Sequence, residues 1–160
     1  MGRKQQKKRH ALTERWYYDA CTLKAGIIYD EIINNTRSTR KLTASFLSLG
    51  EAYGNCFRDG KAEDAPEKFF QLIEALKKAG KLDLISNAGI EKEFKFIREN
   101  CGILEVSDAT HLATAIKNGC NIFRTFDSHF DLTNTQIEVI KKRFGLRYGF
   151  CIQKRNSPIK

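Results

Sequence analysis

The segment RWYYDACTLKAGIIYDEIINN, residues 15–35, joins a short aromatic run directly to a helical pattern. Residues 16–18 are uninterrupted aromatics, which is typical of a strand buried on both faces of a parallel sheet. The run stops at Asp19, and four isoleucines then follow between residues 27 and 33 at the spacing of a helix. A strand that leads into a helix in this way predicts an α/β domain.

The rest of the chain continues the alternation. The patterns predict a short strand from Lys41 that turns helical near Ser48, helices over 65–80, 90–100, 107–119 and 134–145, a strand before Asp127, and a closing strand over 146–152. We therefore predict one α/β domain with a central, mostly parallel sheet over residues 16–152. A flexible basic extension over 1–15 and a frayed tail over 153–160 flank it.

Composition narrows the class of protein. Of the 160 residues, 41% are hydrophobic and 29% charged, which is ordinary for a soluble domain. No apolar run approaches the roughly 20 residues of a membrane span, and no signal peptide follows the basic start. The five cysteines form no CxxC pair, which argues against a structural zinc site. We expect a cytoplasmic protein that does not contact a membrane.

The net charge of +9 is concentrated at the start of the chain. Five of the 28 basic residues lie in the first ten positions, without any acid among them. Such an extension either attracts a polyanion such as nucleic acid or only keeps the protein soluble.

Four acids stand at the ends of predicted elements. Asp19 and Asp127 each end a strand, whereas Glu51 and Asp108 are expected in the first turns of helices. Parallel strands end at one edge of the sheet, where the following helices begin and where such folds bind ligands. Four carboxylates at that edge would repel one another unless a cation lies between them. Oxygen ligands alone indicate Mg²⁺ or Mn²⁺.

Each acid also has a structural explanation. Ser48 and Glu51 have the spacing of a capping box. Ser107 can cap its helix, with Asp108 offsetting the helix dipole. Asp19 can cap the first helix or turn, and Asp127 with Ser128 can simply make a turn.

Four segments in this order resemble the signature segments of the PIN-domain nucleases: YYDACTL (17–23), SLGEAYGN (48–55), SDATHLATAI (107–116) and RTFDSHF (124–130). The resemblance spans Trp16 to Phe150 and implies a three-layer α/β/α fold and an Mg²⁺- or Mn²⁺-dependent endoribonuclease. It assigns the catalytic and metal-binding roles to Asp19, Glu51, Asp108 and Asp127. Thr125 and Asp131 are implied as outer partners of the site.

The chain departs from the family pattern beside the first acid. Many members place Ser, Thr or Asn within two residues of it, whereas this sequence has Ala20 and Cys21 there, and Thr22 is the nearest hydroxyl. His111 lies three residues after Asp108, so a catalytic role competes with neutral packing, and we favour packing. His129 is expected in an exposed turn.

Basic residues are expected to contact the RNA backbone without reading its sequence. The candidates in the extension are Arg3, Lys4, Lys7, Lys8 and Arg9. Those in the domain are Lys24, Arg37, Arg40 and Arg124. Arg37 and Arg40 are equally compatible with a solvated loop.

Within the family, the resemblance implies either the toxin of a toxin–antitoxin pair or an RNA-processing nuclease. The partners would be RNA, an antitoxin protein in the first case, and a second copy of the chain in a homodimer. The rival hypothesis is a non-catalytic RNA-binding or assembly protein that keeps the fold. An aspartyl phosphatase is disfavoured, because DACTL lacks a second Asp two residues after the first.

Overall fold

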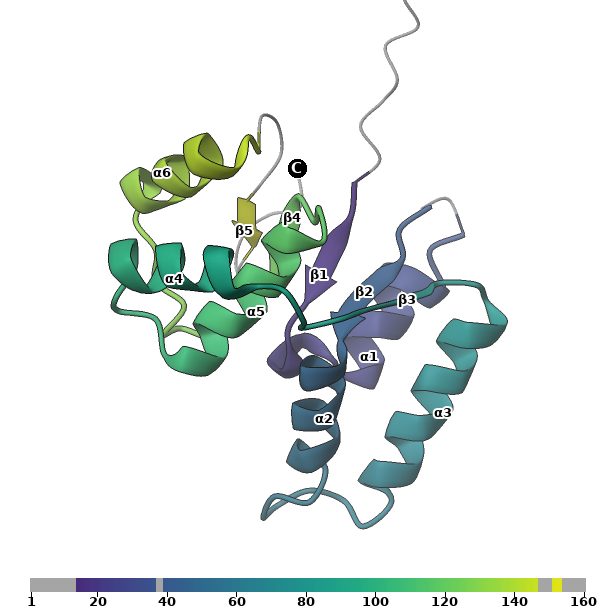
Figure 1. Ribbon diagram of the computed structural model, residues 1–160. Coiled ribbons are helices and arrows are strands. Elements are labelled where there is room, and N and C mark those ends of the chain that lie inside the picture. The colour runs from purple at the N-terminus through teal and green to yellow at the C-terminus, as the bar shows by residue number, and fades with distance from the viewer. Residues whose placement is uncertain (1–13, 37–38, 147–150, 154–160) are drawn as a thin grey trace, which may run out of the picture.

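A computed structural model describes residues 14–36, 39–146 and 151–153 of the chain. Its centre is a five-stranded sheet in the order β3-β2-β1-β4-β5 (Figure 1). The strands are β1 (Trp16–Tyr18), β2 (Leu42–Ser45), β3 (Leu82–Ile85), β4 (Ile122–Arg124) and β5 (Cys151–Gln153). Every pairing between neighbouring strands is parallel. The prediction of an α/β domain on a mostly parallel sheet is confirmed.

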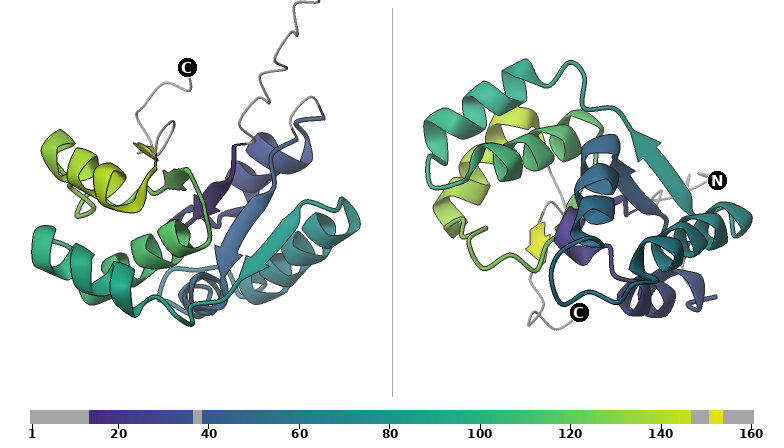
Figure 2. Two further views of the ribbon diagram at one scale, coloured as in Figure 1. Left: turned by 45° about the horizontal axis from the view of Figure 1, so that its top comes forward. Right: turned by 90° about the horizontal axis from the view of Figure 1, so that it is seen from below.

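Helices cover both faces of this sheet and produce three layers (Figures 1 and 2). The α-helices are α1 (Ala25–Ile28), α2 (Phe46–Asn55), α3 (Ala65–Lys78), α4 (Glu91–Asn100), α5 (Val106–Lys117) and α6 (Asn134–Phe144). Helices α1 and α3 pack on one face, and α4, α5 and α6 pack on the other. Among the described residues, no helix is long and apolar enough to cross a membrane.

The aromatic run of β1 explains why both faces need cover. Alternate residues of a strand point to opposite faces, so Tyr17 packs with α5 and α6 while Trp16 and Tyr18 pack with α1 and α3. The Tyr17 ring stacks on Phe123 with the ring centres 5.3 Å apart, and Phe123 stacks on Phe130 at 4.8 Å. Each such buried side chain contributes about 1.5–3 kcal/mol to stability.

Strand β3 was not predicted. It has only four residues, lies at the edge of the sheet and carries Asp83 at its second position, so its hydrophobic pattern is weak. Asp83 holds the residue that precedes β1, since its Oδ2 lies 2.6 Å from Nη2 of Arg15. The Arg15 backbone nitrogen also donates to Oδ1 of Asn121 at 2.8 Å. Arg15, which we assigned to the flexible extension, is therefore held against the domain.

The helix predicted after β1 is less regular than its isoleucine spacing indicated. Its single α-helical segment α1 continues as a π-helical segment, η2 (Tyr29–Ile33). Glu31 lies in this segment, and a charged helix residue of this kind is mostly exposed. It is turned inward instead, since its Oε1 lies 2.7 Å from Nη2 of Arg124 and its Oε2 accepts a hydrogen bond from the Tyr18 hydroxyl at 3.1 Å.

Candidate active site

The four acids singled out from the sequence line one cavity. They come from four separate segments: Asp19 follows β1, Glu51 lies on α2, Asp108 opens α5 and Asp127 follows β4. The cavity has a volume of about 540 Å³, and we call it the acidic cavity. Its lining residues are Asp19, Ala20, Cys21, Glu51, Gly54, Asn55, Arg58, Glu105, Ser107, Asp108, His111 and Asp127. The parallel sheet thus brings together carboxylates that are up to 108 residues apart in the chain.

Two local expectations about these acids were wrong. Helix α2 starts at Phe46, with Ser45 as the cap that accepts a hydrogen bond from the Ser48 nitrogen, so Glu51 lies in the second turn. Ser107 does not cap α5, because the cap position is Glu105 and has no capping side chain. The Ser107 hydroxyl donates to Oε1 of Glu51 instead, at 2.7 Å.

Asp19 is the most buried of the four, with 5% of its surface exposed. It caps the 3₁₀ turn η1 (Ala20–Thr22) by accepting from the Thr22 nitrogen, so its structural explanation also holds. Burial raises the pKa of Asp19, while hydrogen bonds from the Cys21 and Thr125 side chains and the nearby His111 ring oppose that rise. Asp19 is held in place by its neighbours on both sides of the cavity.

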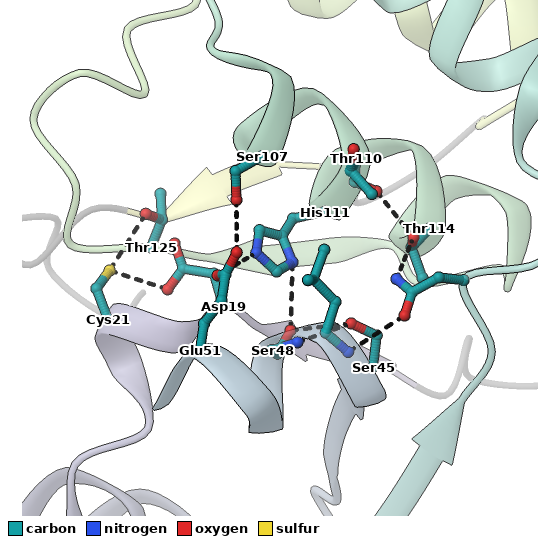
Figure 3. A network of polar contacts seen from close by, with 12 residues as sticks. Asp19, Cys21, Ser45, Ser48, Glu51, Ser107, Thr110, His111, Thr114 and Thr125 are labelled. Atoms are coloured by element: carbon teal, nitrogen blue, oxygen red, sulfur yellow. Dashed lines mark hydrogen bonds and ion pairs between the residues drawn. The ribbon is translucent and has the colours of Figure 1, made fainter. Parts of the chain in front are cut away.

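Cys21 contacts Asp19 from one of the positions where the resemblance led us to look for Ser, Thr or Asn. Its Sγ donates to Oδ1 of Asp19 at 2.9 Å (Figure 3). Burial, followed by the charge of Asp19, raises the pKa of Cys21 to about 12, so the thiol keeps the proton that it donates. The hydroxyl of Thr22 is directed elsewhere, to the Asp19 carbonyl at 2.8 Å.

Glu51 is held by a chain of hydrogen bonds that begins in the core, and Figure 3 shows its contacts with His111 and Ser107. Nε2 of His111 lies 2.8 Å from Oε2 of Glu51, and Nδ1 lies 2.8 Å from the Tyr17 hydroxyl. A carboxylate only accepts, so Nε2 donates, and in a neutral imidazole Nδ1 then accepts from Tyr17. The Tyr17 oxygen in turn lies within 2.9 Å of the Ser45 and Ser48 hydroxyls. His111 is 3% exposed, so it is packed, as favoured above, and it orients Glu51.

Asp108 carries the clearest electrostatic signal of the cavity. Its pKa is raised to about 6, chiefly by burial and then by the charges of Asp127, Asp19 and Glu105, while His111 opposes the rise. The carboxylates therefore repel one another across the cavity. Among the described residues, no group of three or more Asp, Glu, His or Cys side chains stands close enough together to hold a metal ion as it is. The donor set fits a hard divalent cation, because it offers several carboxylate oxygens. A bound cation would also relieve the repulsion between these carboxylates.

Thr125 and Asp131, the two implied outer partners, differ in position. Thr125 is fully buried, and its Oγ1 accepts from the Asp127 nitrogen at 3.0 Å, which ties Asp127 to the Asp19 side of the cavity. Asp131 is exposed and is not among the residues that line the cavity. His129 is also exposed, with its Nδ1 3.1 Å from Oδ1 of Asp127.

Two of the arginines proposed to contact RNA are engaged within the domain, Arg124 as a buried residue and Arg40 as a half-buried one, which argues against that assignment. Arg124 is 5% exposed and paired with Glu31, because the residue after Phe123 points to the opposite face of the sheet, toward η2. The Arg40 guanidinium lies 3.6 Å from the centre of the Trp16 ring and is also close to Glu31. Lys24 is exposed, whereas Arg37 and the basic extension lie outside the described residues.

Arg58 is a cavity residue that the sequence analysis missed. Glu51, Gly54 and Asn55 line the cavity from one face of α2, and Arg58 joins them from the bend that follows the end of this helix. No helical spacing could have singled out Arg58, because it lies beyond the end of α2 and reaches the cavity only through the course of the following bend. Glu105, a fifth acid of the cavity, was also missed, since it lies just before α5.

Comparisons with known proteins agree with this architecture. The model of the PIN domain family matches residues 16–135. The fold is similar to that in the crystal structure of PAE2754 from Pyrobaculum aerophilum, with a TM-score of 0.50 and 18% sequence identity. That match covers 91% of this chain and 99% of the other. The curated proteins with which the chain was compared include no match.

The raised pKa of Asp108 predicts how stability depends on pH in metal-free buffer. Between about pH 4 and pH 6 the folded chain keeps a proton on Asp108 that the unfolded chain has lost. The free energy of unfolding therefore falls as the pH rises through this window. We expect Asp108→Asn to be more stable than the wild type at pH 7, with the difference shrinking toward pH 4. Urea unfolding followed by the fluorescence of Trp16 measures it.

The exposed Asp30 provides the matched control. Asp30→Asn should follow the wild-type pH profile. A loss of stability in Asp108→Asn at pH 7 would contradict the prediction and leave compensation of the α5 dipole as the dominant role of Asp108.

Proposed function

The chain belongs to the PIN-domain family, whose members are generally metal-dependent nucleases, and from this premise we propose that it is an endoribonuclease. The observation that supports this proposal most strongly is the convergence of Asp19, Glu51, Asp108 and Asp127 on one cavity. These four carboxylates would hold Mg²⁺ or Mn²⁺ as all-oxygen ligands. When bound, the cation lowers the pKa of a water molecule and offsets charge on the phosphoryl oxygens.

The protein's own groups position the reaction in this proposal. Thr125 and Cys21 hold Asp19, while His111 and Ser107 hold Glu51, so both carboxylates are oriented before substrate arrives. Arg58 reaches the same cavity with a permanent positive charge suited to a phosphate oxygen. The thiol of Cys21 does not have the environment of an activated nucleophile, since its pKa is raised and it is engaged with Asp19, and the Ser107 hydroxyl has the role of holding Glu51. Water is therefore the proposed nucleophile.

Two cellular settings fit this activity: the toxin of a toxin–antitoxin pair and a stand-alone RNA-processing nuclease. A small antitoxin gene beside this one would favour the first setting. We also propose a homodimer. Tyr53, Phe57 and Phe70 form an aromatic group at the surface of α2 and α3, with Phe57 64% and Phe70 55% exposed. Sedimentation equilibrium tests this, and a monomer at all concentrations would contradict it.

Cleavage of a labelled single-stranded RNA tests the activity. The wild type should cut in the presence of Mg²⁺ or Mn²⁺, and EDTA should stop it. Asp108→Asn should lower kcat by at least about 100-fold, the scale expected when an active site loses one electrostatic group. Asp30→Asn should cut like the wild type. If Asp108→Asn cuts as fast as Asp30→Asn, the acidic cavity is not the active site. If neither cuts and both bind RNA without metal, the non-catalytic alternative is correct.

Metal binding can be measured without RNA. A divalent cation at ten times its Kd should stabilise the wild type by about 1.4 kcal/mol, or a rise in Tm of roughly 3–6 °C for a chain of this size. Asp108→Asn and Asp127→Asn should lose most of this rise, because each removes a charged ligand. Asp30→Asn should keep it. An equal rise in all four proteins would show that the cation binds elsewhere.

A further inference from the structure

A second cavity adjoins the acidic cavity and shares Ala20, Cys21, Asn55 and Arg58 with it. It has a volume of about 480 Å³, within the range of small-ligand sites, roughly 300–1,000 Å³. It lies between the start of α1 and helices α2 and α3, and we call it the basic cavity. Its lining residues are Ala20, Cys21, Leu23, Lys24, Ala52, Asn55, Cys56, Arg58, Lys61, Ala65, Lys68, Phe69 and Leu72.

The walls of the basic cavity combine two kinds of chemistry. Leu23, Ala52 and Leu72 are buried apolar residues, and Phe69 adds a half-buried aromatic ring. The charged residues of the lining are all exposed and all positive: Lys24, Arg58, Lys61 and Lys68. None of the described residues that line it is acidic. An apolar surface with cations around it fits a ligand that is flat and apolar at one end and anionic at the other.

Three of these cations are available to a ligand. Lys68 is paired with Asp64 at 2.9 Å, one turn earlier on α3. Within the described part of the chain, Lys24, Arg58 and Lys61 have no ion-pair partner. Three unpaired cations that lie next to five carboxylates divide the joined surface into a negative part and a positive part. A polyanion entering the acidic cavity alone would be repelled, so a neighbouring positive part is needed to hold it.

We propose that the basic cavity binds the nucleotide next to the bond that is cut, with its base against the apolar wall and its phosphate between Lys24, Arg58 and Lys61. This inference rests on the proposed ribonuclease function and names the part of the substrate that gives it affinity. A nucleotide is the ligand that combines a flat base with an anion, and stacking of a base on apolar and aromatic side chains is tolerant of sequence. Binding one nucleotide here would set the adjoining phosphate over the acidic cavity through the continuous chain of the RNA.

The position of the basic cavity predicts its effect on catalysis. Binding energy from a part of the substrate that does not react can be used to orient the part that does. An RNA whose neighbouring nucleotide lacks its base should therefore be cleaved with a lower kcat and also be bound with a lower affinity. The inference assigns no base preference, because the described lining offers a wall and cations but few groups that could read a base edge.

Charge reversal at Lys61 tests the phosphate contact. Lys61 is exposed in the loop before α3, and the exposed Lys78, at the far end of the same helix, is the matched control. Binding of a fluorescent hexanucleotide is measured in EDTA, with Asp108→Asn as the background, so that no cleavage occurs. Lys61→Glu should raise Kd by about tenfold or more and reduce the magnitude of the salt slope by about 0.7–1. Lys78→Glu should leave both close to the background values.

Removal of single bases tests the apolar wall. In the wild type with Mg²⁺ or Mn²⁺, an abasic residue at one position beside the cleaved bond should lower kcat/KM by about 5- to 100-fold, which is the usual effect of one lost stacking contact. Ala65→Trp, which places a large side chain into the cavity, should lower cleavage of the intact RNA and abolish the difference between intact and abasic RNA. Thermal unfolding confirms that each variant is folded.

The outcomes separate this inference from the function on which it rests. If the wild type cuts RNA but Lys61→Glu and Lys78→Glu bind it equally, the inference is wrong while the ribonuclease proposal stands, and an acidic protein segment becomes the occupant to test. If no RNA is cut but Lys61→Glu alone weakens binding, the basic cavity binds RNA in a protein that is not a nuclease. Equal cleavage of intact and abasic RNA at every position also overturns the role of the apolar wall.

Discussion

Repulsion between half-buried carboxylates is the constraint on which the candidate site depends. Asp19, Asp108 and Asp127 face one cavity, and burial together with the charges of Asp127 and Asp19 raises the pKa of Asp108 to about 6. An arrangement of this kind costs stability in the absence of a cation, and folded proteins retain such costs mainly at functional sites. The all-parallel sheet makes the arrangement possible, because it aligns the ends of β1, β2 and β4 along one edge.

The surrounding structure holds these acids in place at several levels. Tyr17 lies in the central strand of the sheet and is hydrogen-bonded to His111, which is in turn hydrogen-bonded to Glu51. The core therefore orients one carboxylate. The Thr125 hydroxyl forms hydrogen bonds with both the Asp19 side chain and the backbone of Asp127. One buried hydroxyl therefore fixes the positions of these two acids relative to each other. These contacts are made by buried groups whose rotamers are restricted by packing. Asp19, Glu51 and Asp127 are therefore preorganised, which is the property that electrostatic catalysis requires.

Charge is separated along the joined surface of the two cavities. Acids gather where the strands end, whereas Lys24, Arg58 and Lys61 lie beyond η1 and α2. Arg58 lines both cavities and stands at the boundary between them. The net charge of +9 says little about this pattern, because the positive charges that matter here are defined by position. Arg124 is an example, because it contributes to the net charge but is buried and paired with Glu31, so it adds no positive charge to the surface.

The sequence by itself determined the fold class and the four acids, because strand and helix periodicity and the position of each acid beside an element are local properties of the chain. It did not reveal β3, the register of Glu51 on α2, or the inward turn of Glu31 and Arg124. Those features depend on which face of the sheet a side chain meets and on partners distant in sequence. Only the tertiary structure decided that Cys21 supports Asp19, that His111 orients Glu51, and that a basic cavity adjoins the acidic one. Hydrogen bonds and cavities are made between elements, and no local pattern encodes the space that remains between them.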